Sequence, residues 1–446
     1  MISPDEQVRR WTDEEWLRRI LRNAGMVLLG NGAAAAFTMI ALLLSARALG
    51  AGDFGRLSMI AAYVAVADGL LNFQSWQALI RYGSEAKSRN DKGAAELLLG
   101  YGLRLDLTHA LAGAMIACGG ALAAARWFRW DAATLALVFT YSAAILFRIT
   151  GTPTAILRLY DRFKLVAIHS GVQALVRLVF VAIAFANSTG LVGFVAAWAI
   201  ADVVGNVMLW FFARETLRAE RLRVANPFKS GDVLARFPGL RGFVWTTNLH
   251  SAIKLAIKEG DVLVVGALAS TPAAGFYRLA KQIAGAAGKA VAPLYQTIYP
   301  ELAAAVVARE ATRFRQMLYR PGLLAAAGFL ALLIVFVLAG RPLIGLLLGE
   351  SFTEVYWTAC VYLVGTTLSV GSFALHPALL ALGAPAKSLS VLAGSVACYS
   401  GALIYGASVG GSVGAAAAFV LFYVVWTTLM SLVVMREHTR IFAREI

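Results

Sequence analysis

The chain has 446 residues, of which 59% are hydrophobic and only 15% are charged. Soluble domains carry about a quarter charged residues, so this composition excludes an ordinary soluble protein and indicates an integral membrane protein. The formal net charge is +15, but the basic residues recur between apolar stretches instead of covering one soluble domain. We therefore expect the lipid bilayer, and no nucleic acid, as a partner.

The sequence lacks the residue patterns of catalysis and of metal binding. Its three cysteines, Cys118, Cys360 and Cys398, lie within apolar windows and lack the spacing of zinc ligands. Neither a phosphate-binding glycine loop nor a Ser-His-Asp arrangement is present. We expect no enzyme, no metal and no cofactor; coupling to a Na⁺ gradient, a proton gradient or the membrane potential stays open.

The chain begins with a charged stretch at residues 1–25, in which arginines surround an apolar stripe that contains Trp16 and Ile20. This pattern is typical of an amphipathic helix on an anionic cytoplasmic leaflet; the alternative is a solvated lead-in. The apolar run that follows, Met26–Ala46, is longer than the core of a signal peptide, so we expect it to remain as the first span.

Apolar stretches long enough to cross a bilayer continue almost to the end of the chain. A span needs about 20 residues, and turn-forming residues separate the stretches. We predict an all-α protein with about twelve transmembrane helices. Their expected ranges are 26–48, 56–80, 103–125, 132–151, 165–187, 190–213, 242–268, 273–299, 321–340, 354–382, 386–408 and 412–435.

Arginine and lysine gather in the connections that follow the even-numbered helices, and the longest of these connections lies near the middle of the chain. The positive-inside rule therefore places both termini in the cytoplasm. We expect an N-terminal six-helix half at 26–213, a cytoplasmic linker at 214–241, a C-terminal six-helix half at 242–436 and a cytoplasmic tail at 437–446.

Charged residues also lie inside the predicted spans, above all in the hairpin Phe243–Glu301. A charge at the bilayer centre costs about 3 kcal/mol, so such residues usually face protein or water. The alternative is that they are helix-end anchors or internal pairs, such as Lys258 with Asp261 on the same helix face. We predict a cationic cavity for an anionic substrate, formed by Lys254, Lys258, Arg278, Lys281, Lys289 and Arg81.

Two acidic residues are candidates for ion coupling or for pairing with a cation. Asp261 could hold a lysine between substrate visits, or take up a proton or a sodium ion. Asp68 and Arg81 lie on opposite faces of the second predicted helix, and the sequence leaves open which face lines the cavity. Arg177 and Asp202 lie at similar depths in the fifth and sixth helices, so we predict that they form a structural ion pair.

The two halves resemble each other at an offset of about 220 residues. Gly55-Arg56-Leu57 matches Gly275-Phe276-Tyr277, and Thr152-Pro153 matches His376-Pro377. Halves of six helices each share one orientation, so they form a parallel repeat about an axis along the membrane normal. Repeats of this kind place a substrate site between the halves of a transporter.

These motifs, with ARALGAGDFGRLS after the first helix and GDVLVVGALASTPAAGFYRLA in the seventh and eighth, resemble the polysaccharide-transporter branch of the multidrug/oligosaccharidyl-lipid/polysaccharide exporter superfamily. Tyr299-Pro300-Glu301 adds to the resemblance, which covers the chain from about residue 20 onward. It implies a V-shaped central cavity lined by the first, second, seventh and eighth helices. Since most of the predicted cations belong to the C-terminal half, the charge of the cavity should lie mainly on that side.

The resemblance implies a flippase of the bacterial inner membrane. Such a protein moves an undecaprenyl-pyrophosphate-linked oligosaccharide, for O-antigen, exopolysaccharide or a similar surface polymer, from the cytoplasmic to the periplasmic leaflet by alternating access. Polymerase and chain-length proteins of the same pathway are candidate partners. An ion-coupled drug exporter of the same superfamily is the alternative, which a cationic cavity argues against. A membrane polymerase is a remote alternative, because the predicted outer connections are short.

Overall fold

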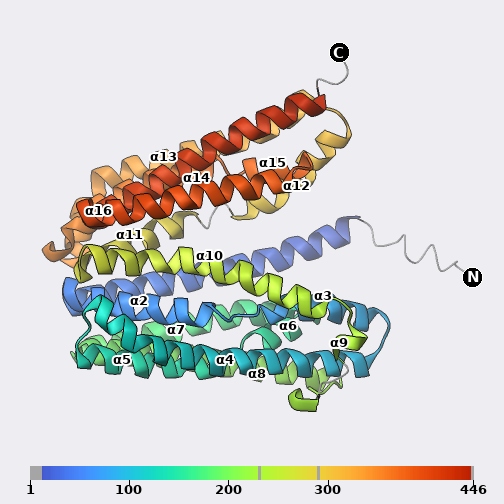
Figure 1. The fold of residues 1–446 in the computed structure, drawn as a ribbon, viewed down its shortest axis with the longest axis horizontal. Helices are drawn as coiled ribbons and strands as arrows, with labels where there is room; N and C mark the ends of the chain where they lie inside the picture. The colour runs from blue at the N-terminus through green and yellow to red at the C-terminus, as the bar shows by residue number, and fades with distance from the viewer. Residues whose placement is uncertain (1–12, 230–232, 289–291, 443–446) are drawn as a thin grey trace, which may run out of the picture. The chain divides into compact units, whose positions relative to one another are not determined.

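A computed structural model describes residues 13–229, 233–288 and 292–442 of the chain. Every regular element in these ranges is a helix (Figure 1). Eight of the described helical stretches are long and apolar enough to cross a membrane. Two of these stretches, Gly32–Ser88 with 57 residues and Pro385–Phe442 with 58 residues, are long enough for two spans each. These features confirm the predicted all-α membrane fold.

The first long helix, α2 (Asp13–Gly69), carries the first predicted span and most of the second. The described part of the N-terminal charged stretch continues into it without a break. At Gly50 the backbone leaves the helical region, with φ 68° and ψ 177°, a conformation that is open essentially only to glycine. The next elements are α3 (Ser75–Ser88), α4 (Lys92–Phe128), α5 (Ala132–Ala143), η1 (Ala144–Phe147), α6 (Gly151–Leu159), α7 (Phe163–Ala186) and α8 (Gly190–Ala219).

The last helix, α16 (Pro385–Phe442), joins the final two predicted spans across a similar glycine kink at Gly411, with φ 59° and ψ −137°. The elements between α8 and α16 are η2 (Pro227–Lys229), α9 (Val233–Arg236), α10 (Leu240–Leu268), α11 (Thr271–Gly288), α12 (Ala292–Val307), α13 (Ala311–Leu348), η4 (Glu350–Phe352), α14 (Thr353–Gly371) and α15 (Leu375–Ala381).

Two spans that we predicted as continuous helices are interrupted, so that prediction was wrong for them: 56–80 breaks at 70–74, and 354–382 breaks at 372–374. A third span, 132–151, is helical to residue 147 and ends in a break at 148–150. Gln74 has a positive φ of 45° at the first break. Short helices follow the other two breaks, with Pro153 and Pro377 as their third residues. Proline suits a first helical turn because its missing N–H would have no partner inside the helix there.

By its internal contacts the chain divides into two compact units. The N-terminal unit comprises residues 1–48 and 60–260, and the C-terminal unit comprises residues 49–59 and 261–446. In the N-terminal unit α7 packs against α8, and α3 packs against α4 and α6. In the C-terminal unit α14 packs against α11, α13 and α16, and α14 runs alongside α13 and α16 (Figure 1). The boundaries of the predicted six-helix halves stay a prediction.

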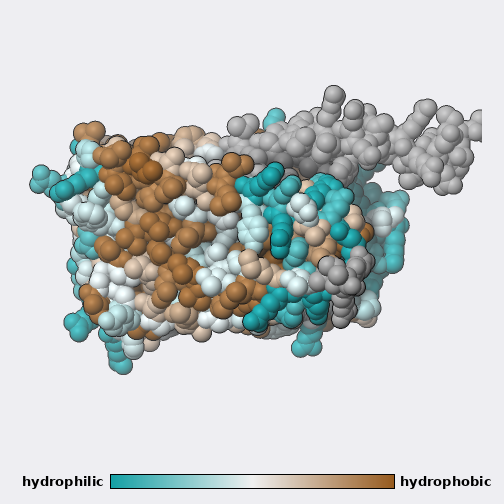
Figure 2. All heavy atoms as spheres, turned by 90° about the horizontal axis from the view of Figure 1, so that it is seen from above, coloured by the Kyte–Doolittle hydropathy of each residue, from teal (hydrophilic) through white to brown (hydrophobic). Residues whose placement is uncertain are grey.

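Large apolar side chains are exposed along the helices. On the face drawn in Figure 2 they form a broad apolar area with hydrophilic residues beyond its edges. On α13 alone, Leu323, Leu324 and Leu338 are each at least two-thirds exposed. Soluble monomers rarely leave so large an apolar area open. Contact with lipid accounts for it, because the hydrocarbon core of a bilayer solvates such side chains.

Candidate functional site

The N-terminal unit contains a group of four charged side chains, which we call the embedded network: Asp68, Arg148, Arg177 and Asp202. Arg148 Nη1 lies 3.0 Å from Asp68 Oδ2, and its Nη2 lies 2.8 Å from Asp202 Oδ2. Arg177 Nη2 lies 2.6 Å from Asp202 Oδ1. The predicted contact between Arg177 and Asp202 is therefore present, but as one part of a larger network.

Neutral donors complete the shell around Asp202. The hydroxyl of Tyr141 donates to Asp202 Oδ2 at 3.1 Å, and Gln173 Nε2 donates to Oδ1 at 3.3 Å. Both carboxylates of the network are mostly buried. Charges inside a membrane protein are tolerated when they pair and when their remaining hydrogen-bonding capacity is satisfied. Because one planar guanidinium bridges two carboxylates, Arg148 fixes their separation and orientation.

Two residues of α4 hold the ends of helices at the breaks. The Asp106 carboxylate accepts from the hydroxyl of Ser75, the first residue of α3, at 2.5 Å. It also accepts from the amide N–H of Thr152, in the first turn of α6, at 2.6 Å. At Thr152 the carboxylate satisfies a backbone donor that a first helical turn leaves without an internal partner, and at Ser75 it holds a side-chain hydroxyl. A side chain at Gly151 would collide with Ser75 Oγ and Asp106 Oδ1, so the close approach requires glycine there.

His109 lies one turn further along α4 and supports the end of α2. Its Nε2 lies 3.0 Å from the carbonyl oxygen of Asp68 and 3.1 Å from the carboxylate oxygen Oδ1 of the same residue. The end of α2, the start of α3 and the start of α6 are therefore all tied to α4. Sequence patterns predicted neither this arrangement nor the part of Arg148 in the embedded network. The one available signal was a single charged residue in an otherwise apolar span, three residues before Gly151-Thr152-Pro153.

The C-terminal unit contains a smaller embedded site, which we call the lysine–aspartate pair. Lys281 Nζ on α11 lies 2.6 Å and 2.8 Å from the two carboxylate oxygens of Asp261 on α10. The Tyr277 hydroxyl donates to Asp261 Oδ2 at 3.1 Å, and the amide of Val262 donates to Oδ1 at 2.8 Å. The predicted pairing of Asp261 with a lysine is therefore present, and the lysine is Lys281 on the next helix. The alternative in the sequence analysis was a pair between Asp261 and Lys258 on the same helix.

Aromatic side chains surround this pair. The Tyr277 ring meets the Tyr362 ring edge to face, with centroids 5.7 Å apart, and Tyr362 stacks on Phe419 at 4.1 Å. Lys281 Nζ lies 5.9 Å from the centroid of Tyr277. Aromatic contact of this kind favours a cation over a neutral group. The arrangement places the ammonium–carboxylate pair beside the phenol rings of Tyr277 and Tyr362.

The other members of the predicted cationic cavity lie in different settings. Lys258 is exposed, and its Nζ lies 3.9 Å from Glu259. Arg278 donates to the carbonyl oxygen of Ser58 at 3.2 Å. Lys289 and the side chain of Lys254 lie outside the described residues. Among the described members, Lys281 is the cation that the structure joins directly to Asp261.

Because the second predicted span is interrupted, Asp68 and Arg81 lie on two different helices. Asp68 belongs to the end of α2, and Arg81 belongs to α3, so a comparison of faces on one helix does not apply. Arg81 is exposed, and its guanidinium lies 5.0 Å from the centroid of Phe243 and 5.4 Å from that of Tyr82. Asp68, in contrast, is part of the embedded network and serves as the partner of Arg148 and His109.

Comparison with known sequences gives two matches. The family model described as "Polysaccharide biosynthesis protein" matches residues 20–306. The inner membrane protein YghQ of Escherichia coli (strain K12) is 27% identical over 352 residues, which cover 78% of this chain and 98% of that protein.

Solved structures share the fold at low sequence identity. An inward-facing multidrug resistance MATE family transporter of the MOP superfamily has a TM-score of 0.72 at 15% identity, covering 92% of this chain and 96% of its own. The lipid II flippase MurJ, in an inward closed conformation, has a TM-score of 0.67 at 11% identity, covering 94% of this chain and 90% of its own. The likeness extends over nearly the whole chain in both cases.

Proposed function

Because this chain belongs to the polysaccharide biosynthesis protein family, we propose that it is a flippase for an undecaprenyl-pyrophosphate-linked oligosaccharide. It is a multi-pass membrane protein with the fold of MOP-superfamily transporters. In the proposal it moves the lipid-linked glycan, a precursor of O-antigen, exopolysaccharide or a similar surface polymer, from the cytoplasmic to the periplasmic leaflet by alternating access. The family match is the observation that carries this proposal. The shared fold is that of transporters and flippases, not of enzymes.

Two further observations support a lipid-linked anion as the substrate. The fold likeness includes a protein named as a lipid II flippase. The described cations of α11, Arg278 and Lys281, also provide the chemistry that a pyrophosphate needs, because lysine offers a point charge and arginine a planar fork for phosphate oxygens. The inner membrane is the proposed location, in agreement with the name of the YghQ relative.

The lysine–aspartate pair suggests how the substrate could be held and released. An arriving pyrophosphate competes with Asp261 for the Lys281 ammonium. When Lys281 leaves, Asp261 keeps the donors from Tyr277 and Val262, so the carboxylate is not left without hydrogen bonds. In this proposal Asp261 either stays ionised or takes up a proton or a sodium ion, which would couple transport to an ion gradient. The embedded network serves as the fixed frame of the N-terminal unit.

The second candidate is an ion-coupled exporter of small molecules or drugs. The MATE fold, with its TM-score of 0.72, favours this candidate, whereas the family match favours the flippase. The two make different predictions in cells. A flippase is needed for a surface polymer, and a drug exporter is needed for resistance to a toxic compound.

The test is a deletion of the gene in the organism that encodes it, followed by analysis of lipid-linked intermediates in each leaflet. The proposal predicts that the undecaprenyl-linked oligosaccharide accumulates on the cytoplasmic leaflet, that one surface polymer is lost, and that the wild-type gene restores it. Normal export of every surface glycan would contradict the proposal, as would loss of glycan synthesis itself. Greater drug sensitivity with normal surface glycans would favour the exporter.

A further inference from the structure

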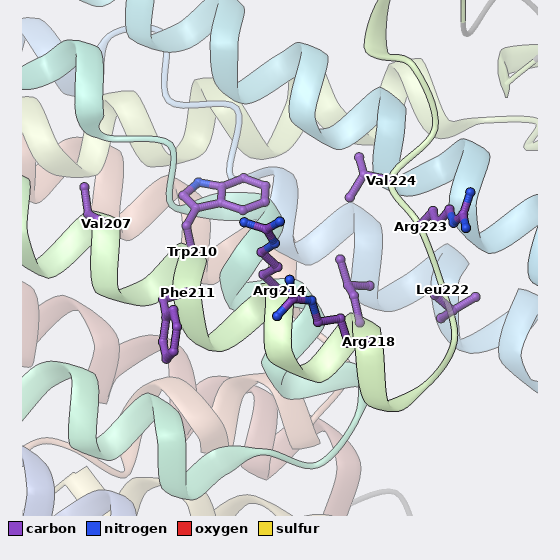
Figure 3. Close-up of a pocket in the computed structure, with 9 residues that line it drawn as sticks. Val207, Trp210, Phe211, Arg214, Arg218, Leu222, Arg223 and Val224 are labelled. Atoms are coloured by element: carbon purple, nitrogen blue, oxygen red, sulfur yellow. The ribbon is translucent and has the colours of Figure 1, made fainter.

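A cavity of about 730 Å³ lies at the C-terminal end of α8 in the N-terminal unit (Figure 3). Three arginines and six apolar residues line it. The arginines are Arg214, Arg218 and Arg223, and the apolar residues are Val207, Trp210, Phe211, Leu217, Leu222 and Val224. The embedded network and the lysine–aspartate pair use none of these residues, so the flippase proposal leaves the cavity without a role.

The outer face of α8 changes from apolar to cationic as it reaches this cavity. Ile200, Val204, Val207 and Phe211 recur every three to four residues, and each is 39–59% exposed. The same spacing continues to Arg214 and Arg218, which are also exposed. Residues with this spacing share one helix face. A single stripe therefore offers an apolar surface for about three turns and then guanidinium groups.

The segment after α8 contains the third arginine, Arg223, and is hydrogen-bonded to α4. The backbone amide of Arg223 donates to Glu96 Oε1 at 2.8 Å, and the amide of Ala225 donates to the carbonyl oxygen of Glu96 at 3.2 Å. The segment lies so close to α4 that a Cβ at Gly100 would come within 2.7 Å of the Ala225 carbonyl oxygen. The cavity wall is thus part of the packed N-terminal unit.

The arginines of the cavity outnumber the carboxylates that contact them. Glu215 pairs with Arg218 at 2.6 Å, with both side chains largely exposed. The Glu215 carboxylate and that of Glu96, which accepts from the Arg223 amide, thus lie against three guanidinium groups. The Trp210 indole N–H donates to the carbonyl oxygen of Ile149 at 2.7 Å, which holds the ring in the wall. Tryptophan and arginine together are typical of the level of the lipid headgroups.

We propose that this cavity binds the phosphate headgroup of an anionic phospholipid, whose acyl chains lie along the apolar stripe of α8. Arginine forks match phosphate oxygens, and the stripe runs directly from the cations to lipid-exposed apolar residues. A free phosphate would use only the cationic end of this surface, whereas a phospholipid uses both ends. The inference goes beyond the flippase proposal, because it concerns a component of the bilayer and does not require transport.

The test compares lipids bound to the purified full-length protein by native mass spectrometry. The probes are phosphatidylglycerol and phosphatidylcholine with matched chains. Each basic residue near an anionic lipid contributes about 1 kcal/mol, so wild type should prefer phosphatidylglycerol about tenfold or more. The variant Arg214→Gln/Arg218→Gln/Arg223→Gln should bind the two lipids nearly equally. The matched control removes three exposed arginines elsewhere, as Arg126→Gln/Arg129→Gln/Arg341→Gln, and should keep the preference.

A second variant, Phe211→Ser, tests the apolar part of the site without a change of charge. It should weaken the binding of phosphatidylglycerol several-fold and leave the elution of the protein on size exclusion unchanged. The proposal is overturned if the triple variant keeps its preference or if the control loses as much. It is also overturned if glycerol 1-phosphate competes as well as the whole lipid, or if undecaprenyl phosphate binds through these arginines and phosphatidylglycerol does not.

Discussion

The two units treat charge inside the membrane differently. In the N-terminal unit two arginines and two aspartates form one connected network, with Arg148 placed between Asp68 and Asp202. In the C-terminal unit one lysine faces one aspartate, which also accepts from Tyr277. Among the described residues, the first arrangement joins four charged side chains through guanidinium groups, and the second joins the Lys281 ammonium to Asp261.

The difference follows from the side chains. A guanidinium has donors in a fixed plane and stays charged, so Arg148 can bridge two carboxylates and hold their geometry. An ammonium is a point charge on a flexible stem, so Lys281 can turn from Asp261 to another anion. We infer that the N-terminal network maintains the fold and that the C-terminal pair exchanges partners during transport. Substitutions in the two units distinguish these roles by how strongly each destabilises the protein.

The largest effect is expected from Arg148→Gln. This change leaves two buried carboxylates without the cation that joins them, and the loss of one partner of a buried pair costs about 3–5 kcal/mol. The measurement is the midpoint of thermal unfolding of the purified protein in detergent. Arg148→Lys is the matched control and should be intermediate, because it restores the charge without the bridge. If Arg148→Gln unfolds at the same midpoint as wild type, the network does not stabilise the fold.

A smaller effect is expected from Asp106→Leu, which removes the acceptor for the amide of Thr152 and the hydroxyl of Ser75. A buried donor without a partner costs about 1–3 kcal/mol. Asp106→Asn keeps one carbonyl oxygen at the site and should lose less. Hydrogen–deuterium exchange should locate the damage at the starts of α3 and α6. If exchange at the starts of α3 and α6 is the same in both variants as in wild type, Asp106 does not hold the two breaks.

The C-terminal pair should respond in the opposite way. The double variant Asp261→Asn/Lys281→Gln removes both charges, and replacing a buried pair as a whole is often close to neutral for stability. We expect a change in unfolding free energy within about 1 kcal/mol, together with loss of surface polymer in a complementation assay. If instead the variant unfolds as readily as Arg148→Gln, or complements fully, the two units do not differ as proposed.

The smallest effect on stability is expected from Lys258→Gln. Lys258 is exposed and lies 3.9 Å from Glu259, so its removal should change the unfolding free energy by no more than about 0.5 kcal/mol. If Lys258 belongs to the substrate site, export should still fall, while Lys258→Arg retains it. Full export by Lys258→Gln would exclude this lysine from the site and leave Lys281 as the better candidate.

The sequence was sufficient for the all-α membrane fold because apolar length and turn residues determine which segments can cross a bilayer. The spans of α7 and α8 lie close to their predicted ranges, and the contact between Arg177 and Asp202 followed from two single charges at similar depth. The breaks were not predictable in the same way. Residues 70–74 and 148–150 contain no glycine or proline to mark a break, and the contacts to Ser75 and Thr152 beyond them come from Asp106, which is distant in sequence.

The candidate site was only partly predictable for a related reason. Charges inside apolar spans marked Asp261 and Lys281 as a group, but helix periodicity favoured a partner for Asp261 on its own helix. The structure places Lys281 of the next helix there, because the short turn between α10 and α11 lets the two helices face each other. Arg148 was missed because it lies in an interruption, where no helical face exists from which its direction could be predicted.

The most direct test of the account is a flipping assay in proteoliposomes that contain the purified protein and a fluorescent undecaprenyl-pyrophosphate-linked oligosaccharide. A reducing agent added outside bleaches only the probe in the outer leaflet, so translocation appears as the further loss of protected fluorescence. The account predicts rapid translocation by wild type and little by Asp261→Asn/Lys281→Gln. Translocation by wild type no faster than in protein-free vesicles, or equal rates for the two proteins, would contradict it.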